Sequence, residues 1–192
     1  MSVKLTFVLF SISFVALTAC SSTVAVDQKK RPVPALIEPT PEPEPTKPPI
    51  PVEFLNASPL QLCARLGEIK VIPTFEPTPT DPIYDALIVK GNAAIPCLIE
   101  KVADKREISD PRYSVPVWQH FAVGDTAVFI LVDIVGKDDK EREKLLIEMM
   151  PPKSQKEWQT NGIYAYFNYV SEAKNRKELQ QWWTKWLKDN NK

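Results

Sequence analysis

The chain has 192 residues, with 24 lysines and arginines against 24 aspartates and glutamates, so its formal net charge is zero. A domain that captures nucleic acid by electrostatic attraction carries a clear basic excess, and the balanced charge therefore excludes that class of partner. The 19 prolines and only 5 glycines also leave little room for a glycine-rich phosphate loop or a dinucleotide-binding turn.

Residues 1–19 have the pattern of a secretory signal peptide. Lys4 supplies an early positive charge, and Leu5 to Ala19 form an apolar run that ends in small residues. A transmembrane helix needs about 20 apolar residues, so this run is too short to span a bilayer. The sequence therefore predicts export from the cytoplasm followed by removal of the segment.

The end of this segment, Leu17-Thr18-Ala19-Cys20, resembles the lipobox of bacterial lipoproteins. The resemblance implies cleavage before Cys20 and acylation of Cys20, with palmitate among the acyl chains that anchor the protein to a membrane. Ser21 stands where an aspartate would retain such a lipoprotein in the inner membrane, which implies the outer membrane and a domain in the periplasm. The alternative is an ordinary signal peptide whose cleavage site holds a cysteine.

Residues 20–52 are predicted to be a tether between the lipidated cysteine and the folded domain. Nine prolines fall between residues 32 and 51, including the near-repeat Glu38-Pro39-Thr40-Pro41-Glu42-Pro43-Glu44-Pro45. Such a density removes backbone donors and fixes φ, so it favours polyproline II over a helix or a sheet strand. Twenty residues in this form span about 60 Å, which predicts a stiff spacer between membrane and domain.

Residues 53–192 are predicted to form a helical domain because apolar residues recur there at helical spacing. Ser58 and Gln61 form a capping box around Pro59, and Asp81 and Asn92 stand in N-cap positions. Residues 163–170 fit a helix, with a strand as the alternative. Helices are predicted over 58–67, 81–90, 92–102, 123–135, 138–150, 163–170 and 179–187.

One part of this domain resembles a HEAT repeat. Tyr84 to Asp104 contain a first helix, a break at Gly91, and a second helix that starts Ala94-Ile95-Pro96 and continues through Leu98-Ile99, Val102 and Asp104. Residues 123–136 resemble the first helix of a following repeat. The resemblance implies a short stack of helical hairpins over about residues 84–150, with 58–67 and 156–189 as caps that complete the core.

The sequence predicts no catalytic residues, no metal site and no cofactor. His120 is the only histidine, and no zinc-protease, nucleophile-elbow or phosphate-loop motif occurs. A zinc site would need several thiols or carboxylates around one imidazole, and no spacing indicates one. Trp182, Trp183 and Trp186 follow a helical stripe, which favours core packing over a sugar-binding platform.

Cys63 and Cys97 are the thiols that remain once Cys20 is acylated. Two cysteines in an oxidising compartment favour a disulfide, so we hypothesise a Cys63–Cys97 bridge. The alternative is a pair of small buried thiols, which are common in protein cores.

Residues 105–122 lack periodicity and form a loop that is long for a compact helical domain. Arginine, tyrosine and tryptophan are frequent in binding hot spots, so we take the loop as the candidate interaction surface. The alternative is that Trp118 and Phe121 pack inward and fix the loop. The candidate interaction residues are Arg112, Tyr113, Trp118 and His120.

These observations together predict an outer-membrane-anchored periplasmic lipoprotein that acts as a protein-binding or scaffolding module rather than an enzyme. Its partners would be the membrane, through acylated Cys20, and a periplasmic protein whose identity the sequence leaves open. One alternative is an inhibitor or enzyme of cell-wall metabolism that acts through the loop at 105–122. A second alternative is a tether that binds peptidoglycan through aromatic residues.

Overall fold

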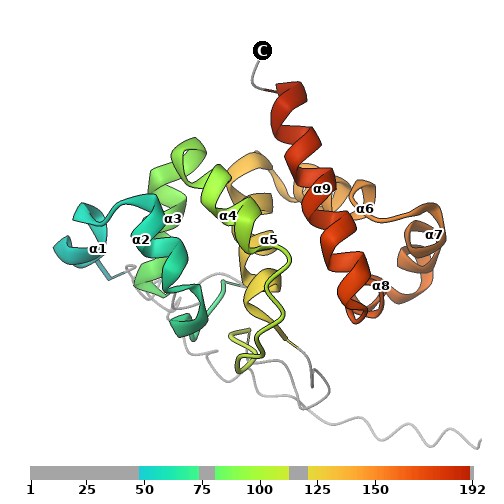
Figure 1. The fold of residues 1–192 in the computed structure, drawn as a ribbon, viewed down its shortest axis with the longest axis horizontal. Coiled ribbons are helices and arrows are strands. Elements are labelled where there is room, and N and C mark those ends of the chain that lie inside the picture. The colour runs from blue at the N-terminus through green and yellow to red at the C-terminus, as the bar shows by residue number, and fades with distance from the viewer. Residues whose placement is uncertain (1–47, 74–80, 113–120, 191–192) are drawn as a thin grey trace, which may run out of the picture. The chain divides into compact units, whose positions relative to one another are not determined.

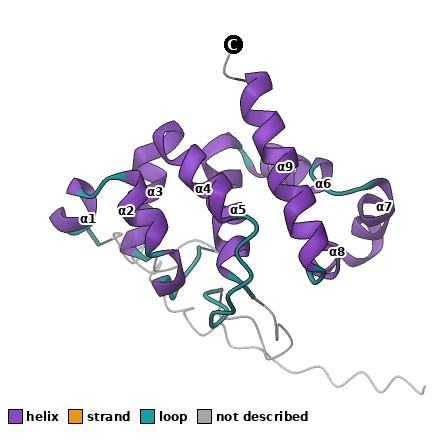
Figure 2. Cartoon of the chain, in the orientation of Figure 1, coloured by secondary structure: helices purple, strands orange, loops and turns teal. Residues whose placement is uncertain are grey.

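The structure is a computed structural model that describes residues 48–73, 81–112 and 121–190. The predicted signal peptide, Cys20 and most of the tether lie outside these residues. Within them, every regular element is helical and the β structure amounts to one isolated bridge, so the predicted all-α fold is confirmed (Figure 2). The helices are α1 (Val52–Asn56), α2 (Pro59–Ala64), η1 (Leu66–Glu68), α3 (Pro82–Lys90), η2 (Gly91–Ala94), α4 (Ile95–Lys101), α5 (Val123–Val135), α6 (Asp139–Glu148), α7 (Pro152–Asn161), α8 (Ile163–Val170) and α9 (Ala173–Asn190).

Two of the predicted helix starts are confirmed by their capping bonds. The Ser58 hydroxyl accepts from the Gln61 backbone N–H at 3.3 Å, and the Gln61 side chain accepts from the Ser58 N–H at 2.8 Å. The Asp81 carboxylate accepts from the Ile83 N–H at 2.9 Å, directly before α3. Short polar side chains with a proline at the first helical position therefore set both boundaries.

Two other boundary predictions are wrong. Asn92 does not cap the second helix of the proposed repeat, because η2 covers Gly91–Ala94 and α4 begins at Ile95 without a side-chain cap. A 3₁₀ turn that runs directly into a helix supplies the first backbone bonds itself, so no capping side chain is required. Gly67 does not end a helix over 58–67, since it lies inside η1 after α2 has ended at Ala64.

Gly91 makes the break between α3 and α4 possible. Its φ of 53° lies in the left-handed region that side-chain-bearing residues rarely adopt. The stretch Pro82–Lys101 is long and apolar enough to cross a membrane by length and composition alone, but 56% of the relevant window is buried inside the domain. The bend at Gly91 and this burial identify the stretch as core helices.

Helix α5 is the centre of the domain. Figure 1 shows α1–α4 on one side of it and α6–α8 on the other, with α9 beside it. Its residues are buried on nearly every side, as its apolar sequence predicts. At its start, Gly124 passes so close to α4 that a Cβ atom there would lie 2.3 Å from the Val102 carbonyl oxygen. Only glycine allows this approach of the two backbones.

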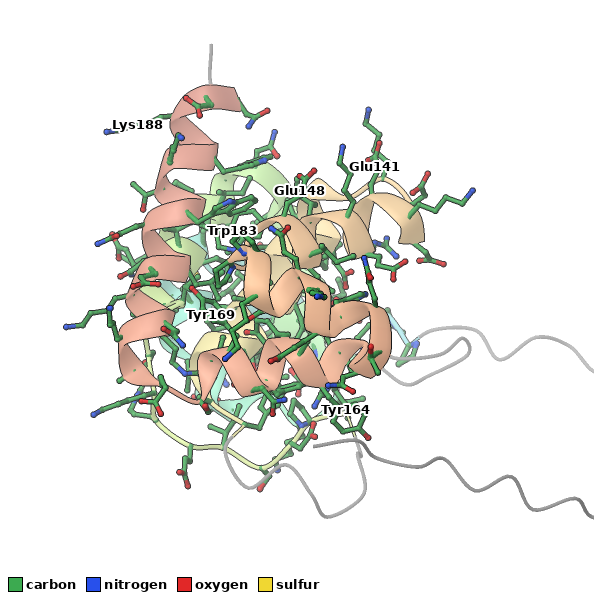
Figure 3. All side chains as sticks on the ribbon, turned by 90° about the vertical axis from the view of Figure 1, so that its right-hand side faces the viewer. Glu141, Glu148, Tyr164, Tyr169, Trp183 and Lys188 are labelled. Carbon is green, nitrogen blue, oxygen red and sulfur yellow. A yellow bond between two sulfur atoms is a disulfide. The ribbon has the colours of Figure 1, made fainter. Side chains whose placement is uncertain are left out.

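The C-terminal helices close the other side of the core. The segment at 163–170 is the helix α8, so the strand alternative is wrong, and α8 packs closely against α7. On α9, Leu179 and Trp183 are completely buried, and Figure 3 labels Trp183. Trp182 and Trp186 lie edge-on to Trp183 at centroid distances of 5.1 and 5.6 Å. The tryptophan stripe therefore serves core packing, as its spacing predicts.

A buried ion pair joins α5, α8 and α9. The Arg176 guanidinium donates to both Asp125 carboxylate oxygens, at 2.8 and 2.9 Å. The Tyr166 hydroxyl and the Ala122 backbone N–H each donate to the same carboxylate at 2.8 Å. Burial raises the pKa of the Tyr166 hydroxyl well above 10, and the neighbouring Asp125 charge adds to this effect, so the phenol stays a donor.

A second carboxylate, Asp133 at the other end of α5, lies between α3 and α6. The Tyr84 hydroxyl donates to one of its oxygens, and Arg142 Nε lies 3.3 Å from the other. Burial raises the pKa of Asp133 to about 6 and outweighs the opposing effect of Arg142, while Asp139 raises the pKa further.

Replacing Arg176 with methionine leaves the Asp125 charge buried without its cationic partner. We expect this change to lower the free energy of unfolding by about 3–5 kcal/mol, measured by urea denaturation followed by circular dichroism. Lys177→Met, on the exposed side of the same helix, is the matched control and should change stability by less than about 0.5 kcal/mol. Equal effects of the two substitutions would contradict this role for Arg176.

Stability should also depend on the protonation of Asp133. Its folded-state pKa of about 6 lies above the ordinary value of 3.8. The contribution of the protonated Asp133 carboxyl to folding stability is therefore fully present below about pH 4 and is lost as the pH rises through 6. Compared with Asp133→Asn, the unsubstituted chain should be less stable at pH 7 by at most about 3 kcal/mol, and the gap should close toward pH 4. If denaturant titrations show that the difference in stability between the two proteins widens as the pH falls, folding lowers the pKa of Asp133 instead of raising it.

Candidate functional site

The described ends of the loop at 105–122 are held together by backbone hydrogen bonds. The Ile108 N–H donates to the Phe121 carbonyl at 2.9 Å, and the Val123 N–H donates to the Arg106 carbonyl at 3.0 Å. The isolated bridge between Glu107 and Ala122 lies between these bonds. The described ends of the loop therefore form a closed base directly before α5.

Arg112 does not belong to an exposed interaction surface, which corrects the prediction made for it. Its side chain is 11% exposed and pairs with Asp110, with Nη2 and Oδ2 3.1 Å apart. Its guanidinium carbon lies 4.9, 5.3 and 4.4 Å from the ring centroids of Phe121, Phe129 and Phe167. A planar cation stacks well on aromatic faces, so Arg112 fastens the loop base to α5 and α8.

The other three candidate loop residues, Tyr113, Trp118 and His120, lie outside the described residues. Phe121, which the alternative interpretation places in the core, is 1% exposed. The described base of the loop thus packs inward through Arg112 and Phe121. The interaction hypothesis therefore depends on residues 113–120 alone.

The structure brings Cys63 and Cys97 together in a disulfide. Cys63 lies on α2 and Cys97 on α4, with their Cα atoms 6.1 Å apart and a sequence separation of 34. Both side chains are buried, at 1% and 7% exposure. The bridge ties the first helices of the domain to α4, which itself packs against α5.

Four of the exposed large apolar side chains among the described residues lie on α1, α2 and α3. They are Val52, Leu55, Leu60 and Val89, which are 69%, 38%, 66% and 64% exposed. Sequence reasoning missed their exposure because the position of an apolar residue outside the core stripe does not show whether a neighbouring element will cover it. The available signals were the i, i+3 spacing of Val52 and Leu55 and the place of Leu60 outside the Leu62–Leu66 stripe.

The described residues bear on two further kinds of site: a metal site and a ligand pocket. No group of three or more histidine, cysteine, aspartate or glutamate side chains that could hold a metal occurs among the described residues. A hollow of about 250 Å³ on the outside of α9, lined by Gln181, Thr184, Lys185 and Lys188, is smaller than an ordinary ligand pocket of 300–1,000 Å³. The buried carboxylate Asp125 is fully hydrogen-bonded and closed to solvent, so its role is structural.

Comparison with known proteins adds no relative: no protein-family model matches the chain, and neither the curated proteins nor the solved structures contain a significant match.

Reduction of the Cys63–Cys97 disulfide should lower stability, because the bridge joins residues 34 positions apart and so removes conformational entropy from the unfolded chain. We expect a loss of about 2–4 kcal/mol when urea denaturation is repeated with a reductant. The double variant Cys63→Ala with Cys97→Ala is the control and should not respond to the reductant. Labelling of both thiols in the folded, unreduced protein would contradict the bridge.

Proposed function

We propose that the protein is an outer-membrane lipoprotein whose helical domain is held in the periplasm by the proline-rich tether and binds a protein partner. The observation that carries this proposal is the combination of the lipobox at Leu17–Cys20 with a buried Cys63–Cys97 disulfide. Disulfides persist in oxidising compartments, so the bridge supports a location outside the cytoplasm. Cys20 is then the one cysteine left for acylation.

The shape of the helical domain supports a binding role. The α3–Gly91–α4 segment has the helix–break–helix order of the HEAT resemblance, and the closest helix pairs are α4 with α5 and α7 with α8. Helices α3 and α4 connect mainly through η2, so the stack is irregular at this point. Stacked helical pairs offer broad surfaces to protein partners, and we propose a short HEAT-like stack on this basis.

A single cellular experiment tests both parts of the proposal. The full chain is produced in a Gram-negative bacterium with a labelled fatty acid, the membranes are separated, and crosslinked partners are identified by mass spectrometry. We expect a label on Cys20, outer-membrane location and one reproducible protein partner. Cys20→Ser should abolish the label and the membrane attachment, whereas Ser21→Asp should keep the label and move the protein to the inner membrane.

A variant of the loop tests which residues bind the partner. Replacing Tyr113, Trp118 and His120 together with alanine should reduce capture of the partner at least about tenfold, a loss of about 1.4 kcal/mol of binding free energy. Helical content should stay unchanged, because the loop base depends on Arg112 and Phe121. Retained muropeptides would favour the peptidoglycan tether, and inhibition of a wall hydrolase would favour the inhibitor.

A further inference from the structure

Both sulfur atoms of the Cys63–Cys97 disulfide are enclosed by the folded domain. Cys63 is 1% exposed and Cys97 is 7% exposed. Cys97 Sγ lies 3.3 Å from the carbonyl oxygens of Pro59 and Ala94, and α2, which carries Cys63, contacts α3, η2 and α4. Thiol–disulfide exchange requires the attacking sulfur to reach the attacked one directly. Another protein therefore cannot exchange with these sulfurs once the domain has folded.

The helices that carry the two cysteines depend on the rest of the domain. Helix α2 has 6 residues and α4 has 7. Isolated helices shorter than about 12 residues are marginal in water, so packing against α3 and α5 keeps these two folded. Before that packing, both cysteines lie in chain without stable structure, and their thiols are accessible. The bridge is therefore made before α2 packs on α4.

A third thiol competes for the same pairing. Cys20 precedes Cys63 by a similar number of residues as separates Cys63 from Cys97. The entropy of closing a loop grows only slowly with its length, so it hardly distinguishes a Cys20–Cys63 pair from the observed one. The thiolate is the species that attacks a disulfide, and lipidation removes it from Cys20. A lipidated chain thus presents only the two cysteines of the observed bridge.

Formation of the bridge also requires an acceptor for electrons. Joining two thiols releases two electrons and two protons, and a chain with three cysteines holds no second disulfide that could take them. Helical domains with mainly local contacts fold in microseconds to milliseconds, whereas disulfide formation takes seconds to hours unless it is catalysed. A slow small oxidant would meet thiols that are already buried. The acceptor is therefore a fast protein oxidant that meets the chain before it folds.

We propose that the chain is a substrate of a disulfide-carrying thiol oxidase, which joins Cys63 to Cys97 before α2 packs on α4, while lipidation withholds Cys20. One chain thiolate attacks the oxidase disulfide, forms a mixed disulfide with one sulfur and releases the other as a thiolate. The second chain thiolate attacks the chain sulfur of the mixed disulfide, which closes the bridge and releases the oxidase. The oxidase gains two electrons and two protons and leaves as a dithiol. The compartment and the lipidation of Cys20 rest on the proposed function.

The order of bridging and folding is tested on the purified full chain carrying Cys20→Ser, which has neither anchor nor third thiol. The reduced chain is diluted from urea, and an oxidised thiol oxidase of the bacterial periplasm is added either at once or after refolding. We expect bridging to be at least about tenfold slower in the second case, because it then waits for local opening of the domain. Equal rates overturn the proposal.

The matched control places an accessible thiol on α9. Thr184 is exposed, so Thr184→Cys in a chain with Cys20→Ser, Cys63→Ala and Cys97→Ala should react equally fast in both cases. Dithiothreitol gives a second measurement that does not require the reduced chain to refold. It should open the native bridge at least about tenfold more slowly than the same bridge in urea, and equal rates overturn the burial on which the proposal depends.

The oxidase itself is tested in a Gram-negative bacterium that lacks its main periplasmic thiol oxidase, grown without added small disulfides. We expect Cys63 and Cys97 to remain thiols there, while the fatty-acid label on Cys20 persists. A complete bridge in this strain overturns the proposal, whereas a missing label with normal oxidase dependence contradicts only the anchor. In the parent strain, Leu17→Arg, which disrupts the lipobox, should yield disulfides that contain Cys20. Their absence overturns the role given to lipidation.

Discussion

The buried Asp125–Arg176 pair is the interaction on which the rest of the domain depends. Asp125 lies in the first turn of α5 and accepts from Arg176 on α9 and Tyr166 on α8, so one carboxylate holds three helices. Desolvation makes such a pair costly unless every oxygen is satisfied, and the Ala122 N–H supplies the remaining bond. The same N–H belongs to the loop base, so the described base of the loop is joined to the core.

Different interactions stabilise the two halves of the domain. The first helices are tied to α4 by the Cys63–Cys97 disulfide, whereas the C-terminal helices are held by the Asp125 cluster and by aromatic packing around Trp183. A covalent bridge suits the half where helices α1 and α2 are short and bury few side chains. It is also consistent with the oxidising compartment proposed for this protein.

The packing gives the described base of the loop at 105–122 a structural role. Arg112 has the residue type of a binding hot spot, yet its cation stacks on Phe121, Phe129 and Phe167 and fixes the chain. The proposed protein-binding role of the loop therefore depends on residues 113–120, which the structure does not describe.

Local patterns in the sequence determined the all-α class, the helix starts at Ser58 and Asp81, and the central helix over 123–135, because capping and periodicity act over a few residues. Tertiary packing decided the long-range contacts and the burial of individual side chains, which these local patterns do not determine. The sequence could not show that Asp125 meets Arg176 fifty-one residues away, or that Arg112 turns inward. Nor could it show which apolar residues stay exposed, since burial depends on partners brought together only by the complete fold.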